Sequence, residues 1–441
     1  MRTAHADVQS RTLRKVTWKF IPLITLCYLA LYLDRHNVAV AALTMNKDLG
    51  IGPAVYGLIA GIFFWTYALF EIPSNYIVSR VGVRVWVSRI IVSWGVVTMA
   101  TAAVVGENSL LVLRLLLGVA EAGFSPAMLF LIASWFPAGR RAMTMSMMAV
   151  AVPLAAVGTP ILTSIMTGMD GLLGMDGWRW LFLLSGLPAV ILGFFFYKVI
   201  RNGPEDAAFL SPEERDWLRT ELSREHATLS GGHGARFRDG IMNVRVLVLV
   251  VVYILFAFSL FGYQFFIPQI LQQLGLKTNA VGWVAALPPL LAIGPMVWWA
   301  RHSDRTKERS RHFAAAAATA GIGFLLAGLL VRHPALAIAG LCVAGIGLYS
   351  CIAIQLAIPS TFLSGAALAA GLATVNGLGN IGGYFGPQIT GVIRGATGDF
   401  KAALLVMAAT ILTASAVALI LDYRLRHANA AVSPKVALDA A

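Results

Sequence analysis

Long apolar segments alternate with short polar ones along almost the whole chain. We place twelve apolar segments near residues 17–42, 55–78, 83–105, 108–136, 142–168, 178–200, 244–272, 281–300, 312–332, 334–358, 365–392 and 399–423. An apolar α-helix of about 20 residues crosses the roughly 30 Å hydrocarbon core of a bilayer, whereas a barrel strand is about half as long and alternates apolar with polar residues. The pattern predicts an all-α membrane protein with twelve transmembrane helices.

The longest polar interruption divides these segments into two pseudo-symmetric sets of six. We expect an N-terminal tail over 1–16, a six-helix bundle over 17–200, a linker over 201–243, a second six-helix bundle over 244–423 and a C-terminal tail over 424–441. Within the linker, Ser211-Pro-Glu-Glu214 is typical of a helix start with a capping box and proline at the first position. An amphipathic pattern follows, which predicts a surface helix on the linker.

Composition and charge narrow the class of protein. Hydrophobic residues make up 58% of the chain and charged residues 12%, which excludes an ordinary soluble domain. A net charge of +13 would suit a nucleic-acid partner, but most Lys and Arg residues lie in the tails and in alternate loops. This bias predicts cytoplasmic termini and no nucleic-acid partner. The three cysteines lie in apolar segments without a CxxC pair or nearby histidine cluster, so we expect no metal site.

Four charged residues interrupt the first and fourth apolar segments: Asp34, Arg35, Arg114 and Glu121. A charge at the middle of a membrane helix costs on the order of 2.5 to 3.5 kcal/mol, so such residues usually face an interior cavity on a substrate or proton pathway. A guanidinium group matches a carboxylate in two parallel hydrogen bonds, and burial favours the neutral form of an acid. We interpret the arginines as anchors for an organic anion and the acids as proton carriers. The competing interpretation is a set of structural ion pairs.

Polar residues elsewhere in the spans give weaker signals. Tyr32 shares a helix face with Arg35, and Asn376, Asn380 and Tyr384 recur every four residues, which predicts a polar stripe on the eleventh span. Asn376 is a candidate for binding substrate hydroxyls, with helix-to-helix hydrogen bonding as the alternative. Residues 377–382 spell GxGxxG, but inside a membrane span this pattern indicates close helix packing and no dinucleotide cofactor.

The loops after the second and eighth spans are alike. Residues 75–84 read NYIVSRVGVR and residues 300–309 read ARHSDRTKER, each with Arg at the sixth and tenth positions. Both resemble the Gly-x-x-x-Asp-Arg-x-Gly-Arg-Arg motif of the major facilitator superfamily. The resemblance implies that the retained residues latch helix ends in one state of an alternating-access cycle. These are Arg80, Gly82 and Arg84 in the first copy and Asp304, Arg305 and Arg309 in the second.

Further motifs are similar to the anion:cation symporter family within this superfamily. They lie at residues 32–37 (YLDRHN), 70–75 (FEIPSN), 114–126 (RLLLGVAEAGFSP), 177–180 (GWRW), 204–207 (PEDA) and 376–387 (NGLGNIGGYFGP). The resemblance implies a monomeric, proton-coupled importer of a sugar acid, a dicarboxylate such as tartrate or an aromatic carboxylate such as phthalate, in a bacterial-type inner membrane. It also assigns the two acids to proton coupling and the two arginines to the substrate carboxylate. It places Tyr67 at a cavity position, where its hydroxyl could donate to a substrate oxygen, with interior packing as the alternative.

Some alternatives stay open at this point. His36 and Ser185 depart from the family pattern, the latter where relatives often carry glutamate. A drug or metabolite exporter of the same superfamily, a channel and a non-transporting membrane receptor are the competing functions. No nucleophile with a base and no metal motif stands out in the spans, so we do not expect an enzyme.

Overall fold

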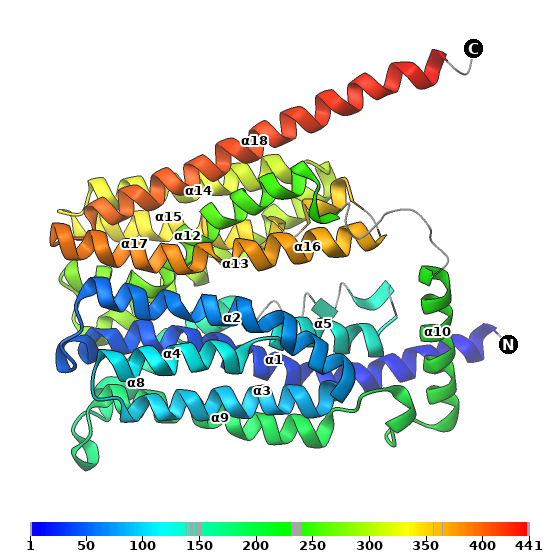
Figure 1. The fold of residues 1–441 in the computed structure, drawn as a ribbon, viewed down its shortest axis with the longest axis horizontal. Coiled ribbons are helices and arrows are strands. Elements are labelled where there is room, and N and C mark those ends of the chain that lie inside the picture. Colours follow the sequence, from blue (N-terminus) through cyan, green and yellow to red (C-terminus); the bar gives the residue numbers. More distant parts are fainter. Residues whose placement is uncertain are drawn as a thin grey trace. The chain divides into compact units, whose positions relative to one another are not determined.

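The structure is a computed structural model that describes residues 2–137, 139–141, 144–145, 151–230, 240–355, 357–363 and 365–438. All the regular secondary structure of these residues is helical (Figure 1). The contacts divide the chain into two compact units. The first comprises Met1–Ile51, Ile62–His233 and Thr278–Trp283, and the second Gly52–Gly61, Gly234–Lys277 and Val284–Ala441.

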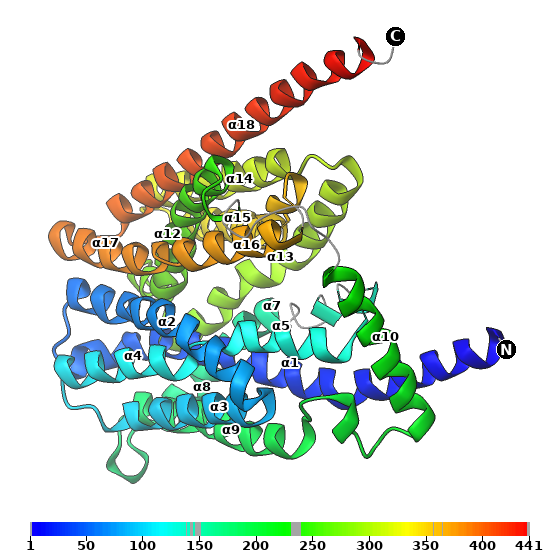
Figure 2. The same ribbon diagram turned by 45° about the vertical axis from the view of Figure 1, so that its right-hand side comes forward.

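The first unit is built mainly from the N-terminal half of the chain. Its helices are α1 (Arg2–Asp48), most of α2 (Pro53–Val81), α3 (Val83–Ala100), α4 (Glu107–Glu121), α5 (Phe124–Trp135), α7 (Ala151–Val157), α8 (Thr159–Gly168), α9 (Gly177–Val199) and α10 (Pro212–Ser230). Helices α3 and α9 lie side by side in both views (Figures 1 and 2). A Cβ atom on Gly95 of α3 would lie only 2.8 Å from the carbonyl oxygen of Gly186 of α9. Glycine at both positions therefore allows the two backbones to approach closely.

The second unit is built mainly from the C-terminal half of the chain. Its helices are α12 (Val244–Gln273), most of α13 (Thr278–Thr306), α14 (Arg309–Leu329), α15 (Pro334–Gln355), α16 (Gly365–Gly379), α17 (Gly382–Thr397) and α18 (Lys401–Leu438). Helix α14 packs against both α15 and α18. A Cβ atom on Gly323 would lie 2.7 Å from the carbonyl oxygen of Gly340, so glycines again permit the contact between α14 and α15.

Ten helices of the described residues are long and apolar enough to cross a membrane. The prediction of an all-α membrane protein with many apolar helices is confirmed. The fifth expected span, 142–168, lies partly outside the described residues and is represented by α7 and α8.

The eleventh expected span, 365–392, is not one continuous helix. It consists of α16 and α17, and the backbone between them makes tighter bonds, from Ile381 N–H to Leu378 C=O and from Gly383 N–H to Asn380 C=O. Such i to i−3 bonds mark a local 3₁₀-like break in a helix. The expected polar stripe is consequently divided, with Asn376 on α16 and Tyr384 on α17.

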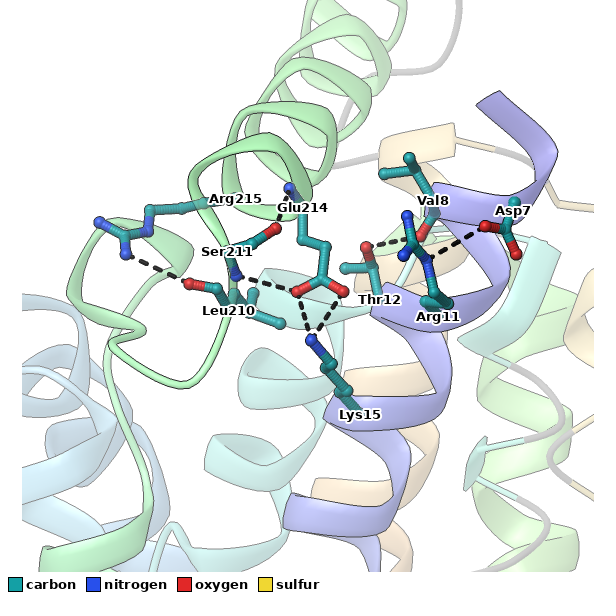
Figure 3. A network of polar contacts seen from close by, with 9 residues as sticks. All are labelled: Asp7, Val8, Arg11, Thr12, Lys15, Leu210, Ser211, Glu214 and Arg215. Atoms are coloured by element: carbon teal, nitrogen blue, oxygen red, sulfur yellow. Dashed lines mark hydrogen bonds and ion pairs between the residues drawn. The ribbon is translucent and has the colours of Figure 1, made fainter. Parts of the chain in front are cut away.

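Helix α10 of the linker is fastened to α1 of the same unit (Figure 3). Its first turn forms a capping box, in which Glu214 N–H donates to Ser211 Oγ and Ser211 N–H donates to Glu214 Oε2. Lys15 Nζ of α1 lies 2.8 Å from each carboxylate oxygen of Glu214. The linker helix is thus joined to α1 through a buried carboxylate that accepts from two donors, Lys15 Nζ and the Ser211 N–H.

This carboxylate predicts a pH-dependent contribution to stability. Burial raises the pKa of Glu214, but hydrogen bonds from Lys15 and from the Ser211 N–H outweigh it and hold the pKa below its usual value. A lowered folded pKa means that the stabilisation is complete above the unfolded value of about 4.3 and is lost as pH falls through the folded value. We expect Glu214→Gln to reduce the free energy of unfolding by about 1 to 3 kcal/mol at neutral pH and by progressively less in acid.

Thermal unfolding of the purified protein between neutral and acid pH measures this difference. Glu213→Gln is the matched control, because Glu213 is exposed on the same turn. An equal effect of the two substitutions at neutral pH would contradict the prediction.

Candidate functional site

The structure brings a charged residue of α1 against one of α4. Arg35 donates from Nη2 to Oε2 of Glu121 at 2.9 Å and from Nε to the same oxygen at 3.2 Å. The Glu121 side chain is 0% exposed and that of Arg35 is 20% exposed. The second carboxylate oxygen of Glu121, Oε1, is buried without a hydrogen-bond partner among the described residues. The guanidinium thus engages only one of the two oxygens and leaves the other without a donor.

Asp34 has quite different surroundings from its neighbour Arg35. Successive residues of a helix point about 100° apart, which turns Asp34 toward α3 and α9. Its Oδ1 accepts hydrogen bonds from Thr98 Oγ1 at 2.7 Å and Asn37 Nδ2 at 2.9 Å. Asn37 also donates to Ser185 Oγ at 3.1 Å. Asp34 is 1% exposed, its Oδ2 has no hydrogen-bond partner, and it forms no ion pair in the described part of the chain. Neutral donors therefore hold this acid.

Aromatic rings surround the guanidinium of Arg35. Its Cζ lies 5.3 Å from the ring centroid of Phe63, 5.5 Å from that of Tyr67 and 5.7 Å from that of Tyr32. The Cζ of Arg114 on α4 also lies 5.3 Å from the Phe63 centroid. A cation over an aromatic face within about 6 Å is attracted by the ring quadrupole. Five of the residues proposed from the sequence, Tyr32, Arg35, Tyr67, Arg114 and Glu121, thus lie in one cluster with Phe63.

Close packing of α2 on α4 places Phe63 between the arginines' helices. A Cβ atom on Gly118 of α4 would lie 2.5 Å from the carbonyl oxygen of Phe63 and 3.0 Å from the backbone nitrogen of Tyr67. Only glycine allows α2 to approach α4 this closely. Gly118 lies one helical turn after Arg114, so the close contact is adjacent to the charged cluster.

Asn376 belongs to the second unit, whereas the charged cluster belongs to the first. Its Oδ1 accepts a hydrogen bond from the Tyr253 hydroxyl of α12 at 3.2 Å. Asn376 therefore links α16 to α12, as in the helix-to-helix alternative, while it remains partly exposed. Tyr253 did not stand out in the sequence because a tyrosine in an apolar span commonly has only a packing role.

The first predicted gating loop forms a tight turn between α2 and α3. Gly82 has φ of 89°, a conformation that side chains other than glycine rarely adopt, and a Cβ atom there would meet the Asn202 side chain. The Arg84 N–H donates to Asn202 Oδ1 at 3.0 Å, and Arg84 Nε donates to the Tyr197 carbonyl at 2.8 Å. Arg80 lies over the ring of Tyr76. This loop is anchored to the end of α9.

The second predicted gating loop joins α13 to α14. Arg309 forms an ion pair with Asp304 at 3.6 Å and donates to the Ala357 carbonyl and to Ser360 Oγ. Arg305 is exposed on the last turn of α13. The acid and arginine of the second copy therefore meet, and the arginine also reaches the segment after α15.

Ten apolar helices in the described residues and a charged cluster buried among them define a multi-pass membrane protein. The model of the major facilitator superfamily matches residues 24–387, and the chain belongs to that superfamily. The resemblance seen in the sequence is confirmed.

Relatives and solved structures agree with this assignment. Two proteins of Agrobacterium vitis named "Putative tartrate transporter" are 40% and 42% identical, over 98% and 94% of this chain and 99% and 92% of their own lengths. A "Quinolone resistance transporter" of Acinetobacter baumannii is 37% identical over 90% of this chain and 92% of its own length.

The fold is also that of solved transporters. An inward-facing bacterial homologue of the human lysosomal transporter Spinster superposes with a TM-score of 0.74 at 17% identity, over 91% of this chain and 96% of that one. A D-xylose–proton symporter gives 0.72 at 15% identity, over 91% of this chain and 97% of that one. The major facilitator fold predicted from the sequence is confirmed.

Proposed function

We propose that this protein imports a small organic anion together with protons by alternating access, with both termini in the cytoplasm of a bacterial-type cell. The observation that carries the proposal is the buried ion pair of Arg35 and Glu121 at 2.9 Å. The names of the Agrobacterium vitis relatives support a hydroxylated dicarboxylate such as tartrate as one substrate class.

The ion pair suggests how a proton and a carboxylate are loaded together. While Glu121 is ionised, it occupies the guanidinium that a substrate carboxylate would need. A proton on Glu121 removes its charge and releases Arg35, which then offers its planar set of donors to the substrate. Loss of the substrate on the other side of the membrane restores the pair and expels the proton.

Charge balance supports two proton sites. With both acids ionised, Asp34, Arg35, Arg114 and Glu121 carry no net charge. One proton leaves the cluster with one positive charge, and two protons leave it with two. A buried cluster is least costly to desolvate when its charges are compensated, so a doubly protonated site matches a dianion. Asp34 carries the second proton in this scheme, on a carboxylate whose Oδ2 is without a hydrogen-bond partner among the described residues.

The remaining predicted residues have supporting roles in the proposal. Tyr32, Tyr67 and Asn376 recognise the hydroxylated or aromatic part of the substrate. The loop residues Arg80, Gly82 and Arg84, and their counterparts Asp304, Arg305 and Arg309, latch helix ends in one state of the cycle. The protein acts as a monomer in the bilayer.

The test uses the full-length protein in liposomes that contain a pH-sensitive dye. Sugar acids, dicarboxylates and aromatic acids are added outside in turn, and internal pH is recorded. We expect acidification with at least one class of anion, and we expect Asp34→Asn to reduce the protons taken up per anion, because only Glu121 then carries one. Asp216→Asn, on the exposed face of α10, is the matched control. Absence of acidification with every anion, from folded protein, would contradict the proposal.

Drug export is the second candidate function. It is favoured by the Acinetobacter baumannii relative named a quinolone resistance transporter. An exporter in the same liposomes would exchange protons for a drug in the opposite direction, so added quinolone would alkalinise the interior of vesicles that hold an acidic buffer. Acidification by carboxylates without a response to quinolones would exclude this candidate.

A further inference from the structure

Phe63 has no polar group, yet its ring lies close to both arginines of the charged cluster, Arg35 and Arg114. Its centroid lies 5.3 Å from Cζ of Arg35 and 5.3 Å from Cζ of Arg114. The two guanidinium carbons therefore lie no further apart than roughly 11 Å, twice the distance at which each cation lies over the ring. Two positive charges at such a separation repel each other in a buried site.

The ring is well placed to hold these charges in position. Phe63 is buried, its ring makes an edge-to-face contact with that of Phe64 with centroids 5.2 Å apart, and it lies 5.6 Å from the ring of Tyr67. The contact of its carbonyl with Gly118 fixes the backbone on the other side. A buried ring packed in this way, whose faces attract both guanidiniums, restricts where the two flexible arginine side chains end.

We infer that Phe63 is the spacer that sets the length of the accepted anion, and that the site selects short diacids in which each carboxylate binds one arginine. The inference rests on the proposed function, in which a proton on Glu121 has released Arg35. A carboxylate carbon in a paired Arg–carboxylate contact lies about 4 Å from the guanidinium carbon. The two carboxylate carbons of an extended four-carbon diacid are also about 4 Å apart. Laid end to end, the diacid and its two arginine contacts span about 12 Å between the guanidinium carbons. This span covers the largest separation of the two guanidinium carbons that the ring allows.

Two ligands of equal length test the requirement for a second carboxylate. Tartrate and threonate both have four carbons and two inner hydroxyl groups, but threonate has a hydroxymethyl group where tartrate has its second carboxylate. Calorimetric binding to the full-length protein in detergent is expected to give a Kd for tartrate about 10- to 100-fold below that for threonate, the range of one additional charged hydrogen bond.

Substitutions at position 63 then separate the spacer from simple packing. Phe63→Met keeps a large apolar side chain and removes the aromatic face, and we expect it to reduce the tartrate-to-threonate preference about 2- to 30-fold, the range of a cation–π contact. Phe63→Leu should do the same, whereas Phe63→Tyr retains the face and should retain the preference. Phe196→Leu, which removes another buried ring on α9, should leave the preference unchanged.

The outcomes distinguish the inference from the function on which it rests. If the wild-type protein binds no carboxylate, the proposed function is wrong, and the inference about Phe63 that rests on it is wrong as well. If tartrate and threonate bind equally, or if Phe63→Met binds both more weakly in the same proportion, the spacer inference is wrong while anion transport stands. Rescue by Phe63→Tyr together with loss in Phe63→Met supports it.

Discussion

Glu121→Gln is expected to reduce proton-driven accumulation of the anion at least tenfold per pH unit of gradient, while exchange of labelled for unlabelled anion persists. Glutamine keeps the shape of the side chain but takes up no proton, so Arg35 is permanently available to the substrate. One proton moving down a gradient of one pH unit supplies about 1.4 kcal/mol, which supports roughly tenfold accumulation. The variant should lose at least this factor for each proton that it no longer carries.

Uptake and exchange are measured in the same liposomes, with and without an imposed pH gradient. Glu107→Gln is the matched control, since Glu107 is an exposed residue at the start of the same helix, α4. Accumulation in Glu121→Gln that follows the pH gradient as steeply as in the wild type would show that Glu121 carries no proton. Loss of both accumulation and exchange would mean that Glu121 is needed for binding.

Arg35→Ala is expected to have the largest effect on stability of any substitution in the cluster. It leaves Glu121 buried with a charge and without its guanidinium partner, and such a loss typically costs about 3 to 5 kcal/mol. Transport should also be lost, because one anchor for the anion is gone. The double variant Arg35→Ala with Glu121→Gln removes both charges and should recover most of the stability but none of the transport.

A double-mutant cycle tests this prediction. Thermal unfolding and uptake are measured for the wild-type protein, both single variants and the double variant. Recovery of stability without transport separates the structural contribution of the pair from its role in binding. If the double variant transports anions as well as the wild type, the pair is structural, which is the alternative raised by the sequence alone.

The charged residues of the site could be predicted because charges are costly in membrane spans. Asp34, Arg35, Arg114 and Glu121 are conspicuous in apolar segments, and the two-turn spacing of Arg114 and Glu121 predicts that both lie on one face of a helix. The sequence could not specify which acid meets which arginine, because that pairing depends on how α1 packs against α4.

Neutral members of the site were harder to predict. Thr98 donates to Asp34 and Phe63 contacts both arginines, but threonine and phenylalanine are common in membrane spans and carry no distinctive signal. The break between α16 and α17 was also missed, although a run of glycines surrounds it. The hydropathy of an apolar segment is the same whether or not its helical backbone is interrupted, so the hydropathy pattern cannot reveal the break.

The compensation of charge in this cluster also constrains how the protein can evolve. A change at any one of the four charged positions leaves an uncompensated charge in the membrane, so it is selected against before it can alter specificity. The uncharged residues around Arg35, namely Tyr32, Phe63 and Tyr67, face no such penalty. New substrates are therefore expected to arise by substitution in this aromatic lining, with the ionic centre inherited unchanged.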